Sequence, residues 1–298
     1  MPPSFAEQAY WDHRFQENKN AFDWLLPPQD VCDLVLNVVK SSTLTSPRLL
    51  HIGCGTSELS YYLRTLVNNA EAICNVDFSE VAVVAGRELE DKLATKNDSV
   101  LEKTVNGTDR MHWAQADLLL PEDVESLMDG IGGIDGLFDV VVDKSTADAI
   151  SCGLNVEMGL PYAVQASHSS QARRQNGGLA STRIHPLHVL AVNIAALTKP
   201  GVGRWVVISY NEDRFPFFSP FVQTAADGML EDEVIQSGFP RPTELWRLEE
   251  KRQVKVPPPN AGKDKPGGSE RAVFIPEVFH WVYVLARTDV QVQMTTSD

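Results

Sequence analysis

The residues best suited to bind a ligand stand at the ends of four short, mostly apolar runs in the first half of the chain. Gly53 follows the run that begins at Arg48, and Asp77, Asp117 and Asp143 end the next three runs. An acid at such a place can accept hydrogen bonds from the two hydroxyls of a ribose, the role expected of Asp77, and Asp117 could accept from an adenine amine. Each acid alone is as readily a helix cap or a turn residue, but the four in this order are far more specific.

The first of these runs ends in the turn Gly53-Cys54-Gly55. Glycines there let the backbone bend sharply and approach a ligand closely. The turn is not a dinucleotide fingerprint, because Glu58 stands where that motif has its third glycine. Phe78, beside Asp77, offers an aromatic face for an adenine ring. The sequence therefore predicts a nucleoside site, and the missing glycine weighs against an NAD-dependent dehydrogenase.

Helical segments separate these runs, which predicts βαβ units and a parallel sheet. A helix over 185–197 and a strand over 204–210 continue the alternation, and residues 243–256 and 278–287 resemble an antiparallel pair. The expected fold class is α/β: a doubly wound, mostly parallel Rossmann-like sheet with an antiparallel C-terminal strand pair and an N-terminal helical cap. Ligands of such sheets bind at the carboxyl ends of the strands, where the four residues above converge.

One domain is expected over residues 1–298, with the helical cap in residues 1–45. Runs rich in polar residues, proline and glycine predict flexible insertions at 155–182 and 257–270. A further helix is expected from Pro220 to Ser237.

The composition is that of an ordinary globular protein with an acidic balance. Of the 298 residues, 43% are hydrophobic and 22% are charged, and the net charge is −14. No nucleic-acid partner is expected, because phosphate backbones attract basic proteins, whereas a Lys-rich protein segment would suit this charge. The four cysteines lack CxxC spacing, so we expect neither disulfides nor a metal site. No signal peptide or membrane span is evident, and a reducing, cytoplasmic location is expected.

The run from His51 to Ser60 resembles the first motif of the class I methyltransferases, the seven-strand, Rossmann-like enzymes that use S-adenosyl-L-methionine. It is most similar to the branch containing the lysine methyltransferases of translation elongation factor 1 alpha. Four other segments resemble that branch: residues 10–15, 75–81, 138–149 and 279–284. The resemblance covers residues 10–150 well and the remainder in patches.

The resemblance implies S-adenosyl-L-methionine as the cofactor and assigns residues to it. The expected cofactor-binding residues are Trp11, Phe15, Trp24, Gly53, Gly55, Asp77, Phe78, Asp117, Leu118 and Lys144. The three N-terminal aromatic residues would close over the cofactor, Gly53 would meet its amino-acid part, and Lys144 would lie near its methionine portion. Asp77 and Phe78 would hold the ribose and adenine, and Asp117 and Leu118 would flank the adenine. The chain departs from the family at Ser145, where glycine is usual, and in its two insertions, which fall where methyltransferases commonly build substrate specificity.

The leading hypothesis is methylation of a lysine side chain in a protein, with an elongation factor as one possible partner. A lysine amine must be neutral when it attacks, and Asp143 is the best-placed acid, with Tyr210 and Asn211 as the second candidates. An orienting or structural hydrogen bond is an equally good reading of Asp143. The histidines are not assigned a role, because lone histidines are usually structural.

Two alternatives remain open at this point. One is a small-molecule N- or O-methyltransferase, which the two insertions keep in play. The other is a cofactor-binding protein without catalysis that acts as a scaffold, against which the intact strand-end acids argue.

Overall fold

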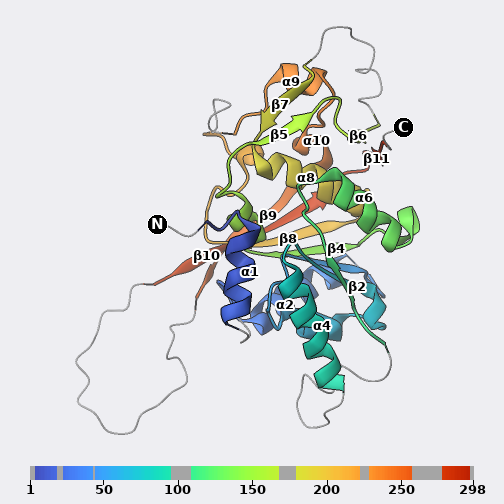
Figure 1. Cartoon of the computed structure of the whole chain (residues 1–298), viewed down its shortest axis with the longest axis vertical. Coiled ribbons are helices and arrows are strands. Elements are labelled where there is room, and N and C mark those ends of the chain that lie inside the picture. Colours follow the sequence, from blue (N-terminus) through green and yellow to red (C-terminus); the bar gives the residue numbers. More distant parts are fainter. Residues whose placement is uncertain are drawn as a thin grey trace, which may run out of the picture.

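A seven-stranded sheet forms the centre of the computed structural model, which describes residues 4–18, 23–42, 44–94, 109–167, 179–221, 228–256 and 277–295 (Figure 1). The strand order is β3-β2-β1-β4-β8-β10-β9. The strands are β1 (Leu49–Ile52), β2 (Ile73–Asp77), β3 (His112–Gln115), β4 (Val140–Lys144), β8 (Arg204–Ser209), β9 (Trp246–Lys255) and β10 (Phe279–Arg287). The first five in this order pair in parallel, and β10 is antiparallel to both β8 and β9. The predicted fold class, including the antiparallel C-terminal pair, is confirmed.

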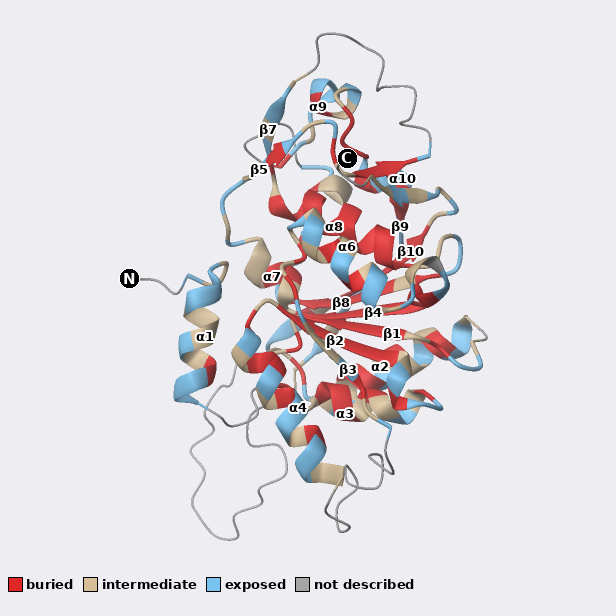
Figure 2. Ribbon diagram, turned by 45° about the vertical axis from the view of Figure 1, so that its right-hand side comes forward, coloured by how far each residue is buried: buried red, intermediate tan, exposed pale blue. Residues whose placement is uncertain are grey.

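Helices cover both faces of the sheet, as a doubly wound fold requires. On one face lie α2 (Pro28–Ser41), α3 (Leu59–Leu63) and α4 (Glu80–Ala94), and on the other lie α6 (Pro121–Gly130), α8 (Pro186–Leu197) and α10 (Pro242–Leu245). Figure 2 shows the buried strands between these two layers. Successive strand residues serve opposite faces: Leu49 packs in the core with α2, and Leu50 packs in the core with α8.

The strand register brings the ligand-binding positions to one edge of the sheet. Ile52 at the end of β1 is level with Val76 of β2 and with Asp143 of β4. The end of β4 is level with the end of β8, where Lys144 pairs with Ile208. Because β10 is antiparallel, its first residues reach the same edge, and Trp281 pairs with Ser209.

The N-terminal helix α1 (Gln8–Glu17) lies across this edge and packs on α4. Three contacts hold it there: the Gln8 amide donates to the Phe78 carbonyl at 2.6 Å, Ser79 Oγ donates to Asp12 at 2.5 Å, and Phe15 lies over Gly55. The predicted cap of residues 1–45 also contains the helix α2, which does not lie with α1 at this edge of the sheet. α2 packs with α3 in the layer that covers the sheet.

Residues within the first predicted insertion form strands. β5 (Val156–Gly159) pairs with β7 (Ser181–Ile184), and β6 (Val164–Ala166) pairs with β11 (Val292–Met294). Parts of the segment 155–182 are thus built into strands, and Met158, Tyr162 and Val164 are buried in the same core as α8. Its polar run 168–178, like the second predicted insertion at 257–270, lies outside the described residues.

The helix expected from Pro220 to Ser237 is not continuous in the described residues. Among the described residues of this range, only α9 (Asp232–Gln236) is helical. Gly228 has φ +97°, a backbone conformation that an α-helix does not contain. Residues 222–227 lie outside the described part of the chain.

Candidate functional site

The turn after β1 is built around two glycines with left-handed backbone conformations. Gly53 has φ +53° and Gly55 has φ +51°. A side chain at Gly53 would overlap the Thr146 hydroxyl, which donates to the Ile52 carbonyl at 2.9 Å. A Cβ at Gly55 would lie 3.3 Å from the Phe15 ring. The sequence therefore needs glycine here both for the turn and for the close packing of α1 and of the segment after β4.

Asp77 connects the end of β2 to this turn. One carboxylate oxygen accepts from the Gly55 N–H at 2.8 Å, and the other accepts from the Ser79 N–H at 2.8 Å. Burial raises the pKa of the carboxyl to about 6, although these backbone hydrogen bonds oppose the shift. The half-buried Phe78 follows, and its carbonyl accepts from Gln8 and Gln115. A carboxylate and an aromatic ring thus stand side by side at the end of β2.

Asp117 and Leu118 lie just beyond β3, which ends at Gln115. The Asp117 carboxylate accepts from the Leu119 N–H at 2.9 Å, so it caps its own turn, and burial raises its pKa. Leu118 is buried, and its carbonyl accepts from Asn193 of α8 at 2.8 Å. The pair lies next to the end of β2, because the neighbouring Ala116 N–H donates to the Asp77 carbonyl at 3.0 Å, and the Asp117 carboxylate is only half-buried.

Asp143 is completely buried beneath the start of α7 (Thr146–Ile150). Its carboxylate accepts from the backbone N–H of Thr146 at 2.8 Å and from that of Ala147 at 3.2 Å. Burial raises its pKa to about 7. Since the group caps a helix and has no exposed surface, this geometry favours the structural reading of Asp143 over direct contact with a substrate.

Lys144 pairs with Asp23, a residue that the sequence analysis did not select. The two side chains form a short ion pair, and Asp23 also accepts from the Ser57 hydroxyl in the segment after the Gly53–Gly55 turn. Burial lowers the pKa of Lys144, and the charge of Asp23 opposes this shift. Asp23 thus joins the N-terminal segment, the glycine turn and the end of β4 in one polar contact.

The N-terminal aromatic residues form a single cluster. The ring centroids of Trp11 and Phe15 are 5.6 Å apart, and those of Trp11 and Trp24 are 6.3 Å apart. The Trp11 indole donates to the Phe5 carbonyl at 2.7 Å. The structure therefore places all three predicted aromatic residues beside the Gly53–Gly55 turn, because Phe15 touches Gly55.

Tyr210 stands farther along the edge, beyond the end of β8. Its side chain is 54% exposed, and its ring centroid lies 5.0 Å from the guanidinium carbon of Arg214. Arg214 is buried and pairs with buried Asp148 of α7 at 2.7 Å. Asp148 also accepts from the hydroxyls of Ser145 and Ser209, at 2.9 and 2.5 Å. No sequence pattern selected this buried pair, whose members lie 66 positions apart.

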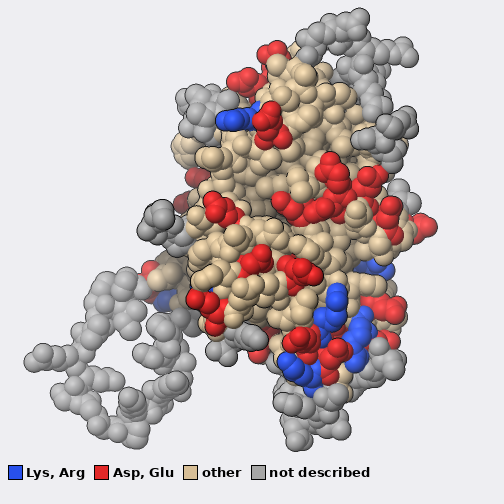
Figure 3. All heavy atoms as spheres, viewed as in Figure 1, with Lys and Arg blue, Asp and Glu red and all other residues tan. Residues whose placement is uncertain are grey.

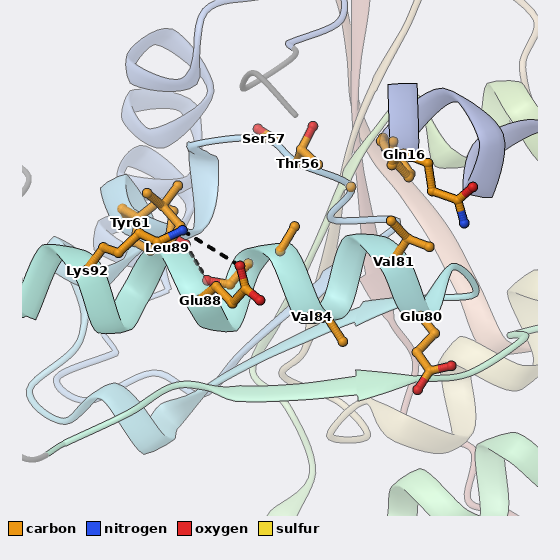
Figure 4. Close-up of a pocket in the computed structure, with 14 residues that line it drawn as sticks. Gln16, Thr56, Ser57, Tyr61, Glu80, Val81, Val84, Glu88, Leu89 and Lys92 are labelled. Atoms are coloured by element: carbon orange, nitrogen blue, oxygen red, sulfur yellow. Dashed lines mark hydrogen bonds and ion pairs between the residues drawn. The ribbon is translucent and has the colours of Figure 1, made fainter. Parts of the chain in front are cut away.

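A cavity lies beside the glycine turn, along α4. It measures about 620 Å³ and includes Phe15 and Gly55, but Asp77 and Lys144 do not line it. Figure 4 shows Gln16 of α1 at one end and Tyr61, Leu89 and Lys92 at the other. A second cavity of about 540 Å³, lined by residues that include Leu154, Arg183 and His185, lies beyond α7. Among the described residues, no group of three His, Cys, Asp or Glu side chains is placed to hold a metal ion.

Comparisons with known proteins find partial matches. No family model matches the chain. Over 152 residues, 50% of this chain, it is 36% identical to methyltransferase srdJ of Neurospora crassa, of which it covers 55%. Over 167 residues, 54% of this chain, it is 30% identical to the human mitochondrial citrate synthase-lysine N-methyltransferase CSKMT, of which it covers 62%. The chain thus spans little more than half the length of these relatives.

One of the similar solved structures is a SAM-dependent methyltransferase from Anabaena variabilis. It overlaps 96% of both chains at 13% sequence identity and a TM-score of 0.46. The fold described above rests on the strand order and register rather than on this overlap. In the part of the chain that the structure describes, no helix combines the length and apolarity needed to cross a bilayer.

Proposed function

We propose that this protein is an S-adenosyl-L-methionine-dependent methyltransferase. The observation that carries the proposal is the meeting of the Gly53–Gly55 turn, the Asp77 carboxylate and Lys144 beneath the aromatic residues of the N-terminal segment. The two curated relatives, both named as methyltransferases, support it. So does the seven-stranded sheet, which is the fold that the resemblance implies.

The residues at this edge fit the chemistry of the cofactor. The Asp77 carboxylate suits a pair of ribose hydroxyls, and Phe78 together with Asp117 and Leu118 suits adenine. Lys144 suits the carboxylate of the methionine portion, and Trp11 and Phe15 can exclude water. The cofactor would supply a methyl group on a sulfonium, already a good leaving group. The protein's own task is then to align an acceptor with that group and to keep the site dry.

The acceptor that we favour is a lysine side chain of a protein. The relative CSKMT is named as a lysine N-methyltransferase, and the resemblance to the elongation factor branch points the same way. The surface in Figure 3 carries acidic side chains over α6, which contains Glu122, Asp123, Glu125 and Asp129 and no basic residue. Such a surface attracts a Lys-rich segment. An elongation factor in the cytoplasm is the partner to test first.

A small-molecule acceptor is the second candidate. The cavity of about 540 Å³ beyond α7 has the size of a small-ligand site. Its lining includes the polar residues Asn155 and His185. The lining residue Gly153 lies two positions after Ser151, which accepts a hydrogen bond from Arg214.

Cofactor binding is tested by calorimetric titration with S-adenosyl-L-methionine and, separately, with NAD. We expect wild-type protein to bind the former and not the latter. Asp77→Asn should weaken binding about 10- to 100-fold, because hydrogen bonds to a charged group are worth about 1.5–3 kcal/mol. Asp129→Asn, an exposed position on α6, is the matched control and should bind like wild type. Folded wild-type protein that does not bind S-adenosyl-L-methionine refutes the proposal.

The acceptor class is tested with methyl-labelled cofactor. Wild-type protein is incubated with a protein extract and, in parallel, with a protein-free metabolite extract of the source cells. Label recovered as methyl-lysine after acid hydrolysis of the protein fraction supports the favoured acceptor. Label found only in the metabolite fraction assigns the second candidate instead.

A further inference from the structure

The ion pair between Asp23 and Lys144 lies at the edge of the sheet that carries the proposed site. Lys144 is the last residue of β4, and Asp23 belongs to the segment between α1 and α2. The Ser57 hydroxyl also donates to Asp23, and Ser57 lines the cavity beside the glycine turn (Figure 4). Because Ser57 Oγ accepts from the Leu59 N–H at 3.1 Å, its own proton is left for Asp23. The Asp23 carboxylate is thus held from two sides, by the end of β4 and by the start of α3.

One oxygen of the Asp23 carboxylate is open to a ligand. Lys144 and Ser57 both donate to Oδ1. Oδ2 accepts from no donor among the residues that the structure describes, and it is not one of their fully buried polar atoms. The Asp23 side chain is 21% exposed, against 4% for Lys144, so the carboxylate is the more accessible partner of the ion pair.

The backbone that follows Asp23 is held in a strained turn. Leu25 has φ +65°, and the Leu26 N–H donates to the Trp24 carbonyl at 2.8 Å, which makes a tight three-residue turn. Strained residues of this kind persist where the surroundings hold them, and they gather at ligand clamps. Trp24 packs against Trp11 in the aromatic cluster, so the turn presents Asp23 beside the residues expected to close over the cofactor.

The other carboxylates at this edge have different places or partners. Asp77 lies at the end of β2, where the ribose is expected, and both of its oxygens accept from backbone N–H groups. Asp143 caps α7 without any exposed surface. Asp148 is buried and paired with Arg214. Of these carboxylates, Asp23 alone combines an open oxygen with a place beside Lys144.

The methionine portion of S-adenosyl-L-methionine is a zwitterion at neutral pH, with an α-ammonium beside an α-carboxylate. A site that takes both charges out of water must supply a partner for each, because an unpaired buried charge is costly. Lys144 suits the carboxylate but would repel the ammonium. An ionised carboxylate accepts strong, charge-assisted hydrogen bonds from an ammonium.

We propose that Oδ2 of Asp23 binds the α-ammonium of the cofactor, an inference that rests on the proposed function. Asp23 and Lys144 then match the zwitterion at both of its ends, carboxylate to ammonium and ammonium to carboxylate. Because Lys144 and Ser57 already hold Oδ1, the carboxylate is in place before the cofactor binds. Asp23 thus makes the site selective for ligands that carry the complete amino-acid portion.

The test is calorimetric titration with S-adenosyl-L-homocysteine and with its deaminated analogue, in which hydrogen replaces the α-amino group. Wild type should bind the former about 10- to 100-fold more tightly, the range expected for a hydrogen bond between charged groups. Asp23→Asn should bind the two ligands within about threefold of each other, because asparagine offers the ammonium no charge. Asp23→Glu keeps a charge for Lys144 but moves the carboxylate by one methylene, so it should reduce the preference about three- to tenfold.

Two controls separate binding of the ammonium from a general loss of structure. Methylthioadenosine, which lacks the amino-acid portion, should bind wild type and both Asp23 variants equally, which shows that the fold and the adenosine side of the site are intact. Glu58, a half-buried carboxylate next to Ser57, gives the matched variant. Glu58→Gln should keep the preference of wild type for S-adenosyl-L-homocysteine.

The outcomes distinguish this inference from the proposed function. If folded wild type binds neither S-adenosyl-L-methionine nor S-adenosyl-L-homocysteine, the proposed function fails and this inference fails with it. If wild type binds S-adenosyl-L-homocysteine and the deaminated analogue equally, the inference alone is overturned, and no variant is needed for that result. An Asp23→Asn variant that weakens for both ligands alike shows that Asp23 only positions Lys144, and tighter binding shows that Asp23 competes with the cofactor's carboxylate. Either result overturns the assignment, as does an unchanged preference in Asp23→Glu or a lost one in Glu58→Gln.

Discussion

Replacing the buried Asp143 by asparagine should stabilise the protein at neutral and alkaline pH. The carboxyl has no exposed surface, and burial raises its pKa from 3.8 to about 7. Its helix-capping hydrogen bonds from Thr146 and Ala147 need an oxygen but no charge. Asparagine keeps one such oxygen and removes the cost of burying the charge.

The size and sign of this stabilisation follow from the pKa of Asp143 in the folded and in the unfolded protein. Because the folded-state pKa is raised, the folded protein binds the proton more tightly than the unfolded chain does. The free energy of unfolding therefore falls as pH rises from 3.8 to about 7 and is level above that. Between pH 5 and pH 7, an interval of about two pH units, the free energy of unfolding of the wild type falls by about 3 kcal/mol. In the Asp143→Asn variant this group no longer makes stability depend on pH. The variant loses about 1 kcal/mol of stability, because its hydrogen bond with Ala147 is weaker.

The assay is urea unfolding of wild type and Asp143→Asn at pH 5 and pH 8. The difference in the free energy of unfolding between variant and wild type should shift by about 3 kcal/mol in favour of the variant between these pH values. Asp77, whose pKa is also raised, is present in both proteins and cancels. Asp129→Asn on the surface should show no such shift. An equal effect of Asp143→Asn at both pH values would refute the reasoning.

Two glycine substitutions test the packing that positions the site. Gly53→Ala should lower the free energy of unfolding by about 2–4 kcal/mol, because of its φ of +53° and its overlap with Thr146. In thermal or urea unfolding, adding Thr146→Ala should restore only the part of this loss that comes from the overlap. Gly86→Ala, within α4, should lose about 1–3 kcal/mol because its Cβ would overlap the Trp113 ring, although alanine favours helices. Gly130→Ala in α6 meets nothing within 4 Å and should be neutral or slightly stabilising; equal losses at both positions would contradict this account.

The strand-end residues could be predicted because the signal is local. An apolar run that stops at glycine or aspartate identifies both a strand and its end, as at Gly53 and Asp77. Parallel pairing then brings the ends together without further information. The approximate positions of Asp117 and Leu118 follow in the same way, although the structure puts them two or three residues past the end of β3.

The partners of these residues could not be predicted, because they come from distant parts of the chain. Asp23 meets Lys144 across 121 positions, and Arg214 meets Asp148 across 66. Nothing in the local pattern distinguishes these side chains from other surface charges.

The strands within 155–182 left a signal of another kind, in the helix that they cover. All twelve residues of α8 are buried, and only His188 and Asn193 interrupt an otherwise apolar sequence from Pro186 to Leu197. A helix that is apolar all round must be covered on both sides, and the sheet can cover only one. The second cover comes from the segments that contain Met158, Tyr162 and Val164, and from Phe239 after α9. A further layer beyond α8 was therefore implied by α8 itself, even though the short strands that build it have no clear pattern of their own.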